Sequence, residues 1–377
     1  MPGVPKPSWH RKSSWKPEPF VTLHNEILDL CDLLMPTTQE TDGRTTALAS
    51  AKEMILGILD SADCRPRVEV YGSEFTGLVT PGSDLDLVVM GRVAQDAFKM
   101  LSEGIQERAK RGEVQQVEVL DKAKVPLVKF VHTETGVAID VTVKNNTGLI
   151  SGQAMKDAMT QMKQVRPLTL VLKVYLAQKD LNKTYTGGIG SFMVQLMVIA
   201  LVQKCNREAK SNGHDPPTDL GYLLYEFFEF YGNQLNYRTT GITLLGPEGG
   251  FFNKFELAWF SPYRPDLLTF QNPLEPDVDI GQKAFQVGLF RKAFRYTSQR
   301  IARGVARARY HNSESAAVGR HGILQLVIDP KNPELRDRVL PPPTWCSAVF
   351  EEKQNARRST AYDDSFSSVT GKRKFSP

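Results

Sequence analysis

The stretch Val70-Tyr71-Gly72-Ser73, followed after ten residues by Asp84-Leu85-Asp86-Leu87-Val88-Val89, decides the fold. It places a Gly-Ser turn ahead of two carboxylates in a run that is otherwise typical of a buried strand. Because successive side chains of a strand point to opposite faces, Asp84 and Asp86 are expected on one face, about 7 Å apart. Two buried acids repel each other and are costly to desolvate, and divalent cations would remove both costs. The alternative, a solvated surface strand, is disfavoured by the apolar neighbours.

A third carboxylate, Asp140, lies in the apolar strand predicted at 137–143. Antiparallel pairing of this strand with the one at 84–90 is expected to bring Asp140 beside Asp84 and Asp86. Three carboxylates could hold two Mg²⁺ (or Mn²⁺) ions, which prefer oxygen ligands, and such a pair of ions suits an in-line displacement. Asp140 would also be placed to take a proton from an attacking hydroxyl. The alternative is a pairing of Asp140 with an arginine or lysine elsewhere in the chain.

Three further features suit phosphate binding. Gly72 allows close backbone approach, and the amide and hydroxyl of Ser73 can donate to phosphate oxygens. Lys173 stands in an apolar helix, where it needs an anion, either a triphosphate or a structural carboxylate. The loop 186–192 opens the next helix, so Ser191 could bind phosphate and Phe192 could stack on a base. Gly-Ser pairs and glycine-rich loops are common, so each feature alone is weak.

Composition is that of a globular chain, with 377 residues, 41% hydrophobic residues and a net charge of +5. No apolar run reaches the ~18 residues that span a bilayer, so no membrane partner is expected. The patterns predict an α/β plus α fold, in which a small mixed sheet with a helix near 95–110 precedes a mainly helical domain. Strands are predicted at 67–71, 84–90, 114–120, 125–131, 137–143 and near 242–245. Helices are predicted at 23–34, 45–60, 151–163, 167–180, 190–206, 219–231 and 282–303.

Positive charge is concentrated between Gln282 and Tyr310, where eight basic residues occur and no acidic one. Such a stretch suits a polyanion or forms an ordinary solvated helical face, and the segment alone does not choose between them. The polar stretch 350–377 is expected to be disordered. Within it, Lys372-Arg373-Lys374 is a candidate nuclear address.

Taken together, the motifs resemble those of the DNA-polymerase-β-like nucleotidyltransferase superfamily. They resemble more closely the noncanonical poly(A) polymerases of the TRAMP nuclear RNA-surveillance complex. The similarity runs over roughly 20–300 and is carried by many motifs in one order. These are the stretches 23–27, 72–73 with 84–87, 124–129, 172–173, 178–182, 185–192, 222–232 and 272–276.

The resemblance implies a five-stranded nucleotidyltransferase catalytic domain over 45–147 and a helical central domain, termed PAP-associated, over 21–44 and 148–310, with ATP in the cleft between them. A flexible arm over 1–20, a C-terminal extension over 311–349 and the tail 350–377 complete the expected organisation. Asp84, Asp86 and Asp140 would be catalytic metal ligands. The nucleotide would be bound by Gly72, Ser73, Ser83, Asn145, Lys173, Ser191, Phe192 and Asp279, and Arg291, Lys292 and Arg295 would contact RNA.

The implied activity is template-independent transfer of AMP from ATP to RNA 3′ ends. In the loop 276–282, Gln282 stands where relatives often have arginine, and Val278 stands where uridylyl-adding relatives commonly have histidine, which favours adenine. A terminal uridylyltransferase is the nearest alternative, and a catalytically inactive scaffold of an RNA-decay assembly is a third reading. The resemblance also implies a nuclear location and partnership with a zinc-knuckle RNA-binding protein and an RNA helicase.

Overall fold

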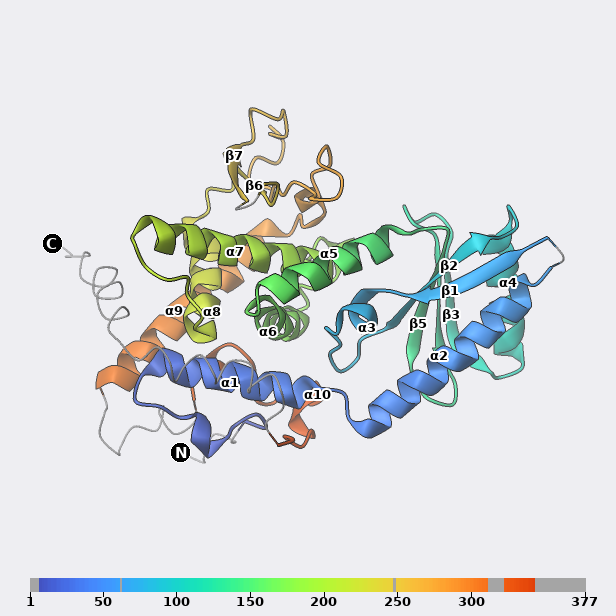
Figure 1. Ribbon diagram of the computed structural model, residues 1–377, viewed down its shortest axis with the longest axis horizontal. Helices are drawn as coiled ribbons and strands as arrows, with labels where there is room; N and C mark the ends of the chain where they lie inside the picture. The colour runs from blue at the N-terminus through green and yellow to red at the C-terminus, as the bar shows by residue number, and fades with distance from the viewer. Residues whose placement is uncertain (1–6, 62, 247–248, 311–321, 343–377) are drawn as a thin grey trace.

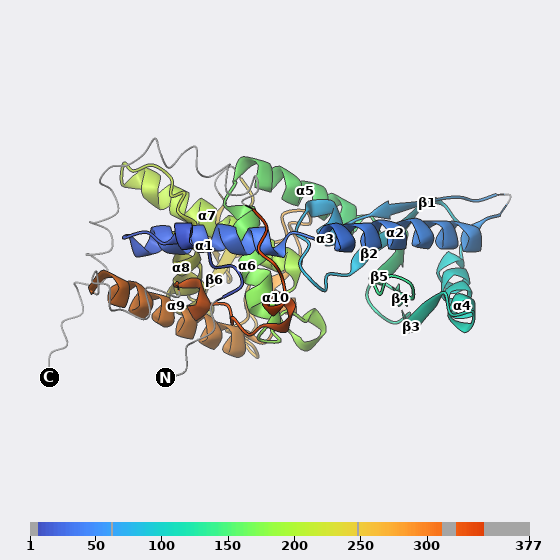
Figure 2. The same ribbon diagram turned by 90° about the horizontal axis from the view of Figure 1, so that it is seen from below.

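The computed structural model describes residues 7–61, 63–246, 249–310 and 322–342 (Figure 1). The whole predicted tail 350–377, including Lys372-Arg373-Lys374, and the parts 311–321 and 343–349 of the predicted extension lie outside the described residues. The described chain has two hydrophobic cores, one around a β-sheet and the other among helices. Figures 1 and 2 show these as the two ends of an elongated molecule, with the sheet at one end. No helix among the described residues is long and apolar enough to cross a membrane.

The larger sheet contains five strands in the described part of the chain, in the order β1-β2-β5-β4-β3. Its strands are β1 (Arg65–Val70), β2 (Leu85–Arg92), β3 (Val114–Leu120), β4 (Leu127–His132) and β5 (Ala138–Val143). A short helix α3 (Gly72–Thr76) connects β1 to β2, and α4 (Ala97–Lys110) connects β2 to β3. The predicted mixed sheet is confirmed, whereas α3 was not predicted because its five residues are too few for a helical period.

The predicted antiparallel pairing of β5 with β2 is wrong, because the two strands run parallel, with Asp86 opposite Asp140. Helix α4 returns the chain so that β3 runs in the same direction as β2, as in any βαβ connection. Two antiparallel turns, β3 to β4 and β4 to β5, then give β5 that direction as well. The three acidic side chains still come together, but through the register of a parallel pair.

One face of the sheet packs on helices α2 (Thr38–Leu59) and α4, and this face takes alternate residues of β2 and β5. Leu85, Leu87 and Val89 of β2 and Ile139 and Val141 of β5 belong to that core. Strand alternation therefore places Asp86 and Asp140 on the opposite face.

Helix α2 begins earlier than predicted. Thr37 is its N-cap, and the Thr37 and Glu40 side chains form a reciprocal capping box with the backbone. The predicted division between domains at 44/45 therefore falls inside a continuous helix, and the chain passes from one half to the other at residues 35–37.

The helical half consists of α1 and the helices that follow the sheet. These are α1 (Pro19–Leu34), α5 (Thr147–Gln161), α6 (Val165–Ala177), α7 (Ser191–Ser211), α8 (Leu220–Glu229), α9 (Val287–Tyr310) and α10 (Pro333–Arg336). The remaining elements are η1 (Lys12–Ser14), η2 (Thr184–Thr186), the π-helical η3 (Phe230–Gln234), η4 (Gly281–Lys283), η5 (Leu324–Leu326) and the hairpin of β6 (Thr240–Thr243) and β7 (Gly250–Asn253). Helix α6 runs through the middle of this half, and ten of its thirteen residues are buried.

The prediction of a flexible arm over 1–20 is wrong for the described residues 7–20. Trp9 is completely buried in the helical core, and α1 begins at Pro19. The Arg11 guanidinium pairs with Asp29 at 2.7 Å and Asp32 at 3.3 Å, both on α1. The arm lacks periodically spaced hydrophobic residues, so its sequence does not predict an ordered element. Burial of Trp9 fixes it to the helical core.

The segment 322–342 crosses back over α1 and is held there by a buried carboxylate. The Oε2 atom of Glu26 accepts hydrogen bonds from the backbone amides of Ile323, at 2.7 Å, and Leu324, at 3.0 Å. Gly322 has φ +82°, and a Cβ atom there would lie 1.5 Å from Oε1 of Glu26. Burial raises the pKa of Glu26 to about 7, against the lowering effect of the two amides.

Replacing Glu26 by glutamine is expected to make the protein less sensitive to rising pH. A raised folded-state pKa means that the stabilising, protonated form is fully populated below pH ~4.5 and is lost as pH rises through about 7. Wild-type stability should therefore fall relative to Glu26→Gln between pH 5 and pH 8, by about 2 kcal/mol. Urea unfolding of both proteins at the two pH values measures this difference. A constant difference would show that Glu26 is ionised in the folded protein at both pH values.

Candidate functional site

A cavity of about 450 Å³ lies between the sheet half and the helical half. From one side it is lined by α3, by the loop 77–84 that follows α3, and by the start of β2, and from the other by α5, α6 and α7. Many of the residues predicted from sequence to form a site line this one cavity. They are Gly72, Ser73, Ser83, Asp84, Asp86, Lys173, Ser191 and Phe192.

The Gly-Ser turn and the acidic motif touch each other directly. Tyr71 donates its backbone amide to the carbonyl of Asp86 at 3.0 Å, which fixes the turn against the start of β2. Gly72 has φ +66°, and a Cβ atom on it would lie only 1.9 Å from Oδ2 of Asp86. The Asp86 carboxylate therefore occupies the space that any side chain at position 72 would need.

Asp140 does not line the cavity itself but lies directly opposite Asp86 in the neighbouring strand β5. Its carboxylate accepts a hydrogen bond from Lys129 of β4 at 2.5 Å, and the same ammonium lies 3.9 Å from Asp84. Lys129 is the residue directly opposite Asp140 in the β4–β5 pair. The basic partner that the sequence left open for Asp140 is thus present, and its charge is shared with Asp84.

The electrostatics of the site show a shortage of positive charge. Burial, and then the negative charges of Asp140 and Asp84, raise the pKa of Asp86 to about 7. Burial also raises the pKa of Asp140, against the lowering effect of Lys129. The pKa of Asp86 stays raised although the charges of Lys129 and Lys173 both lower it, so these ammonium groups do not fully compensate the three carboxylates. Carboxylate oxygens are the ligands that Mg²⁺ prefers.

The donor set thus fits a divalent metal in its chemistry. Among the described residues, however, no three acidic, histidine or cysteine side chains are gathered closely enough to hold an ion as they stand. A metal bound between Asp84 and Asp140 would compete with Lys129 for the same oxygens.

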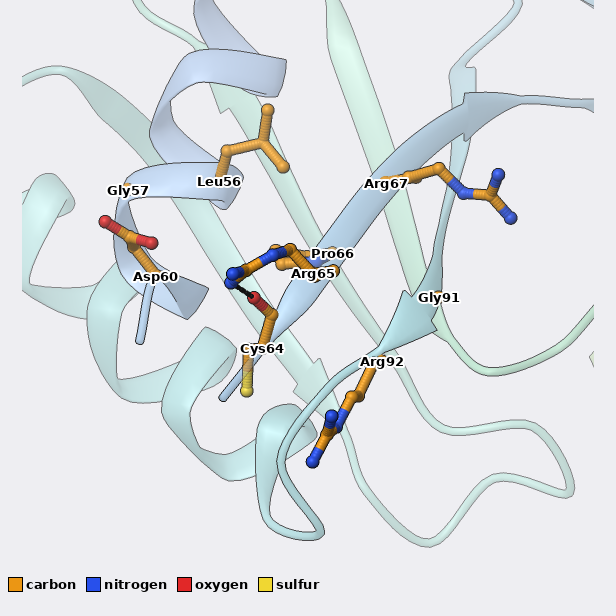
Figure 3. A pocket seen from close by; sticks show the side chains of 9 residues that line it. All are labelled: Leu56, Gly57, Asp60, Cys64, Arg65, Pro66, Arg67, Gly91 and Arg92. Atoms are coloured by element: carbon orange, nitrogen blue, oxygen red, sulfur yellow. Dashed lines mark hydrogen bonds between the residues drawn. The ribbon is translucent and has the colours of Figure 1, made fainter. Parts of the chain in front are cut away.

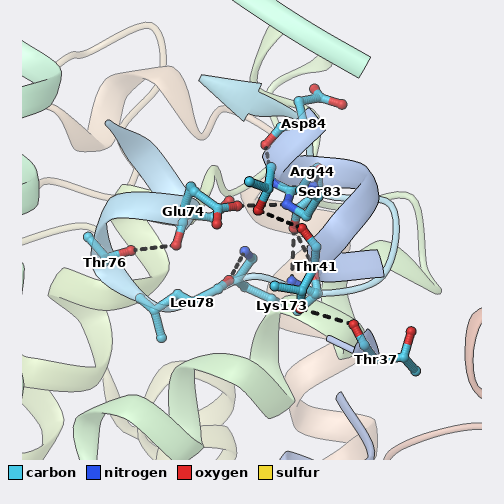
Figure 4. A network of polar contacts seen from close by, with 12 residues as sticks. Thr37, Thr41, Arg44, Glu74, Thr76, Leu78, Ser83, Asp84 and Lys173 are labelled. Carbon is cyan, nitrogen blue, oxygen red and sulfur yellow. Dashed lines mark hydrogen bonds and ion pairs between the residues drawn. The ribbon is translucent and has the colours of Figure 1, made fainter. Parts of the chain in front are cut away.

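An arginine that the sequence did not single out holds the acidic motif in place (Figure 4). Arg44 of α2 donates to the carboxylate of Glu74 at 2.6 Å and to the backbone carbonyls of Ser83, at 2.7 Å, and Asp84, at 3.3 Å. It therefore ties α3, which begins with Gly72-Ser73, to the residues just before β2. No sequence signal marks Arg44, because its partners are a residue 30 positions away and two backbone carbonyls.

Lys173 comes from α6, so it brings the helical half to the cavity. Its ammonium donates to the carbonyl of Leu78 at 2.6 Å, and burial lowers its pKa to about 8 although Asp86 opposes that effect. The structural partner is thus a backbone carbonyl rather than a carboxylate. Two further N–H groups on Lys173 remain for a ligand.

Ser191 and Phe192 open helix α7 on the same side, with Ser191 exposed and Phe192 half-buried against the helical core. One turn further, Gln195 also lines the cavity, and its buried Oε1 atom has no hydrogen-bond partner among the described residues. No sequence signal marks Gln195 as a site residue, because the sequence of an apolar helix does not show in which direction a polar side chain on it points.

The other predicted site residues lie outside this cavity. Asn145 accepts a hydrogen bond from the Thr147 amide at the start of α5, and Asp279 accepts from the amides of Phe270 and Gly281, both at 2.9 Å. Arg291 stacks on the ring of Tyr237, and Arg295 donates to Asn233 at 2.9 Å, while Lys292 is exposed. These five residues have local structural partners or face solvent on other surfaces, and their predicted contacts stay predictions.

Two family models match the chain. Residues 23–156 match the model described as poly(A) RNA polymerase, mitochondrial-like, central palm domain, and residues 219–278 match the model of the Cid1 family poly A polymerase. The first match contains the Gly-Ser turn and all three carboxylates, and the second ends within the loop 276–282.

The chain is similar to poly(A) RNA polymerase CID14 of Cryptococcus neoformans, with 30% identity over 273 residues, which are 72% of this chain and 35% of that protein. The chain spans between about a third and a half of the length of such curated relatives.

Among solved structures, the polymerase core of TRAMP, a RNA surveillance complex, matches with a TM-score of 0.74 and 26% identity, over 85% of this chain and 98% of that one. The Cid1 poly (U) polymerase with Mg 3′-dATP bound matches with a TM-score of 0.62 and 20% identity, over 78% and 96%, and this likeness shows the fold alone.

Proposed function

Because the chain belongs to the noncanonical poly(A) RNA polymerases, we propose that it transfers AMP from ATP to RNA 3′ ends without a template. The observation that carries the proposal is that Asp84 and Asp86 meet the Gly72-Ser73 pair in a cavity lined by both halves of the chain, with Asp140 opposite Asp86 in the neighbouring strand. A carboxylate cluster beside a phosphate-sized gap is what a two-metal nucleotidyl transfer requires.

In this proposal the triphosphate lies between the two halves. The Ser73 amide and hydroxyl and Ser83 donate to it from the sheet half, while Lys173 and Ser191 contact it from α6 and α7. Phe192 offers a ring for the base, and Gln195 an unused acceptor. Asn145 and Asp279 remain candidates for the ribose and base only if the halves close further on the nucleotide.

The reaction joins the 3′-oxygen of the RNA to the α-phosphorus of ATP and breaks the bond from that phosphorus to the bridging oxygen. Pyrophosphate leaves, and the buried ammonium of Lys173 lies where it can offset the charge of that group. Asp140 is the proposed acceptor of the 3′-hydroxyl proton, because it is a buried carboxylate with a raised pKa.

Asp84, Asp86 and Asp140 are the proposed ligands of two Mg²⁺ (or Mn²⁺) ions. When bound, such ions stabilise negative charge on the phosphates and make the 3′-hydroxyl a better nucleophile. Each ion also supplies the positive charge that Lys129 alone does not provide.

The choice of base decides between the proposed transfer of AMP and its nearest alternative, the transfer of UMP. The loop 276–282 carries Val278 and Gln282 on either side of Asp279, whose side chain is bound to backbone amides of its own loop. Val278 is 37% exposed and cannot donate or accept a hydrogen bond from its side chain, so it does not offer a polar contact selective for uracil. This favours ATP over UTP, and terminal uridylyl transfer remains the alternative.

The direct test is extension of a labelled single-stranded RNA with each of the four nucleoside triphosphates in turn. We expect tails with ATP and Mg²⁺, at least about tenfold faster than with UTP, and no tails from the variant Asp84→Ala/Asp86→Ala. A preference for UTP would replace the adenylyl assignment by the uridylyl one. Full activity of the double variant would refute the active site, and no extension with any nucleotide would favour the scaffold reading.

We further propose that the protein acts in a TRAMP-like assembly in the nucleus, with a zinc-knuckle RNA-binding protein and an RNA helicase. The likeness to the polymerase core of TRAMP supports this proposal. Co-purification from nuclear extract, followed by mass spectrometry, would identify the partners.

A further inference from the structure

A second cavity, of about 650 Å³, lies beside the start of α10, where Asn332 and Pro333 line it. Its walls are the end of α6, the middle of α9 and the segment 325–333. Three basic side chains line it, Lys179, Arg300 and Lys331, each from a different one of these walls. We call these three residues with their cavity the basic pocket.

The cations of the basic pocket are not neutralised by ion pairs among the described residues. Burial, and then the nearby charge of Arg300, lower the pKa of Lys179, as expected for two cations that share a pocket without an anion. One carboxylate, Asp329, also lines the pocket, and it accepts a hydrogen bond from the backbone amide of Lys331 at 2.9 Å. The balance of three cations and one anion leaves the pocket positive.

The basic pocket and the nucleotide cavity share two walls. Leu176 and Ala177, the last two residues of α6, line the nucleotide cavity, whereas Gln178 and Lys179, which directly follow α6, line the basic pocket. In the C-terminal segment, Glu334 lines the first cavity and its neighbour Pro333 the second. The two cavities are therefore neighbours, lined by residues that are adjacent in the chain at two places.

The pocket is held in shape by hydrogen bonds between its walls. The Gln178 side chain donates to the carbonyl of Val327 at 2.7 Å and accepts from the amide of Asp329 at 3.0 Å. Further along, Arg338 donates to the carbonyls of Leu33 and Met35 and to Glu40. Because these bonds fix the segment to α6, α1 and α2, little ordering is left to be done when a ligand binds.

An exposed aromatic residue stands next to the pocket. Tyr296 lies one turn before Arg300 on α9, is 57% exposed, and has the Arg300 guanidinium 5.7 Å from its ring centre. Unpaired cations beside an exposed ring are the combination that single-stranded nucleic acid uses, with phosphates on the cations and a base stacked on the ring. This surface differs from the predicted one, since Arg291 and Arg295 of α9 are engaged with Tyr237 and Asn233.

We propose that the basic pocket and Tyr296 bind the RNA strand just upstream of its 3′ end. Phosphodiester groups lie between Lys179 and Arg300, with Lys331 at the rim, and one base stacks on Tyr296. The inference rests on the proposed function for the direction of the strand, but binding itself requires no catalysis.

The test is the salt dependence of RNA binding, measured by fluorescence anisotropy with a labelled twelve-residue oligo(A) and no ATP. Each lost phosphate contact on single-stranded RNA reduces the slope of log K against log salt by about 0.7. The double variant Lys179→Ala/Arg300→Ala should therefore lose about 1.4 from the slope and bind roughly tenfold more weakly at 0.1 M salt.

The matched control is Arg67→Ala/Arg92→Ala, which removes the same charge from a different cavity. That cavity lies at the end of β1 and β2 farthest from Asp86, and Figure 3 shows that Arg67 and Arg92 point away from each other. This variant should keep the wild-type slope within about 0.3, since its arginines contact no phosphate. An equal fall in both double variants would show that only net charge matters and would overturn the proposal.

Variants of Tyr296 distinguish stacking of a base on its ring from a general electrostatic attraction of the RNA. Tyr296→Ala should weaken binding about tenfold with an unchanged slope, and Tyr296→Phe, which retains the ring, should bind as the wild type does. In the extension assay, the double variant should raise KM for the long RNA at least fivefold and leave kcat and KM for ATP unchanged. An unchanged slope in Lys179→Ala/Arg300→Ala would assign the pocket to another anion, such as an acidic peptide.

The outcomes keep the two proposals apart. If the wild-type protein adds no nucleotide but Lys179→Ala/Arg300→Ala still weakens RNA binding, the proposed RNA-binding role of the basic pocket is supported and the proposed transferase activity is refuted. If Lys179→Ala/Arg300→Ala extends long RNA as the wild type does, only the proposed RNA-binding role of the basic pocket is refuted.

Discussion

Replacing Asp86 by asparagine is expected to abolish nucleotide transfer while making the metal-free protein more stable. Asp86 is the most confined of the three carboxylates, lying over Gly72 and between the charges of Asp84 and Asp140. Its amide counterpart keeps the shape but removes one of the like charges that burial makes costly. We expect a gain of about 1–2 kcal/mol in the unfolding free energy in EDTA.

The same substitution removes a proposed metal ligand, so activity should fall roughly 10³-fold or more. Mg²⁺ should raise the melting temperature of the wild type and leave that of Asp86→Asn unchanged, because binding only to the folded state stabilises it. The control is Asp157→Asn on the exposed face of α5, whose carboxylate accepts a hydrogen bond from the exposed side chain of Gln153. Loss of stability in Asp86→Asn without metal would mean that Asp86 is held by a cation in the resting protein.

Much of the fold was predictable from local pattern. The apolar runs with period two gave the five strands of the larger sheet, and the apolar stripes with period 3.6 gave α1, α4, α6 and α7 to within a few residues. The acidic motif on β2 could be interpreted because charge on an apolar strand is rare enough to require a reason. These are signals contained within a few consecutive residues.

The direction of β5 was not such a signal. Whether β5 runs parallel or antiparallel to β2 depends on α4 and on the two turns that precede β5, so the wrong pairing was as compatible with the local pattern as the right one. The same limit applies to Lys129, which meets Asp140 only through the register of β4 on β5. The sequence predicted that a basic partner could exist but not which residue it would be.

Arg44 and Glu26 illustrate a second limit. Each binds mainly to backbone groups of a distant segment, Arg44 to the carbonyls before β2 and Glu26 to the amides after Gly322. Backbone groups are the same in every residue, so no pairing of residue types reveals these contacts. The sequence likewise did not show where the N-terminal arm docks, because a single buried Trp9 leaves no periodic pattern.

Replacing Gly72 by alanine is expected to reduce transfer about a hundredfold with a smaller loss of stability. Two costs arise at this position, one from the backbone and one from space. At φ +66° an L-residue other than glycine is strained by about 1 kcal/mol. In addition, the new Cβ would lie 1.9 Å from the Asp86 carboxylate, so Asp86 or the turn must move by more than an ångström. A displacement of that size at a reacting centre is what costs about 10² in rate.

A variant of Gly77 distinguishes the backbone strain from the steric clash. Gly77 has φ +71°, but a Cβ atom on it would have nothing within 4 Å. Gly77→Ala carries the same backbone strain, only five residues further along, without pressing on Asp86. Gly77→Ala should therefore lose about 1 kcal/mol of stability, Gly72→Ala should lose more, and only Gly72→Ala should lose most of its kcat. Equal losses of kcat would mean that rigidity of the whole loop controls the rate. A normal rate in Gly72→Ala would mean that the Asp86 carboxylate can leave its place over the turn without consequence, which the proposed metal site does not allow.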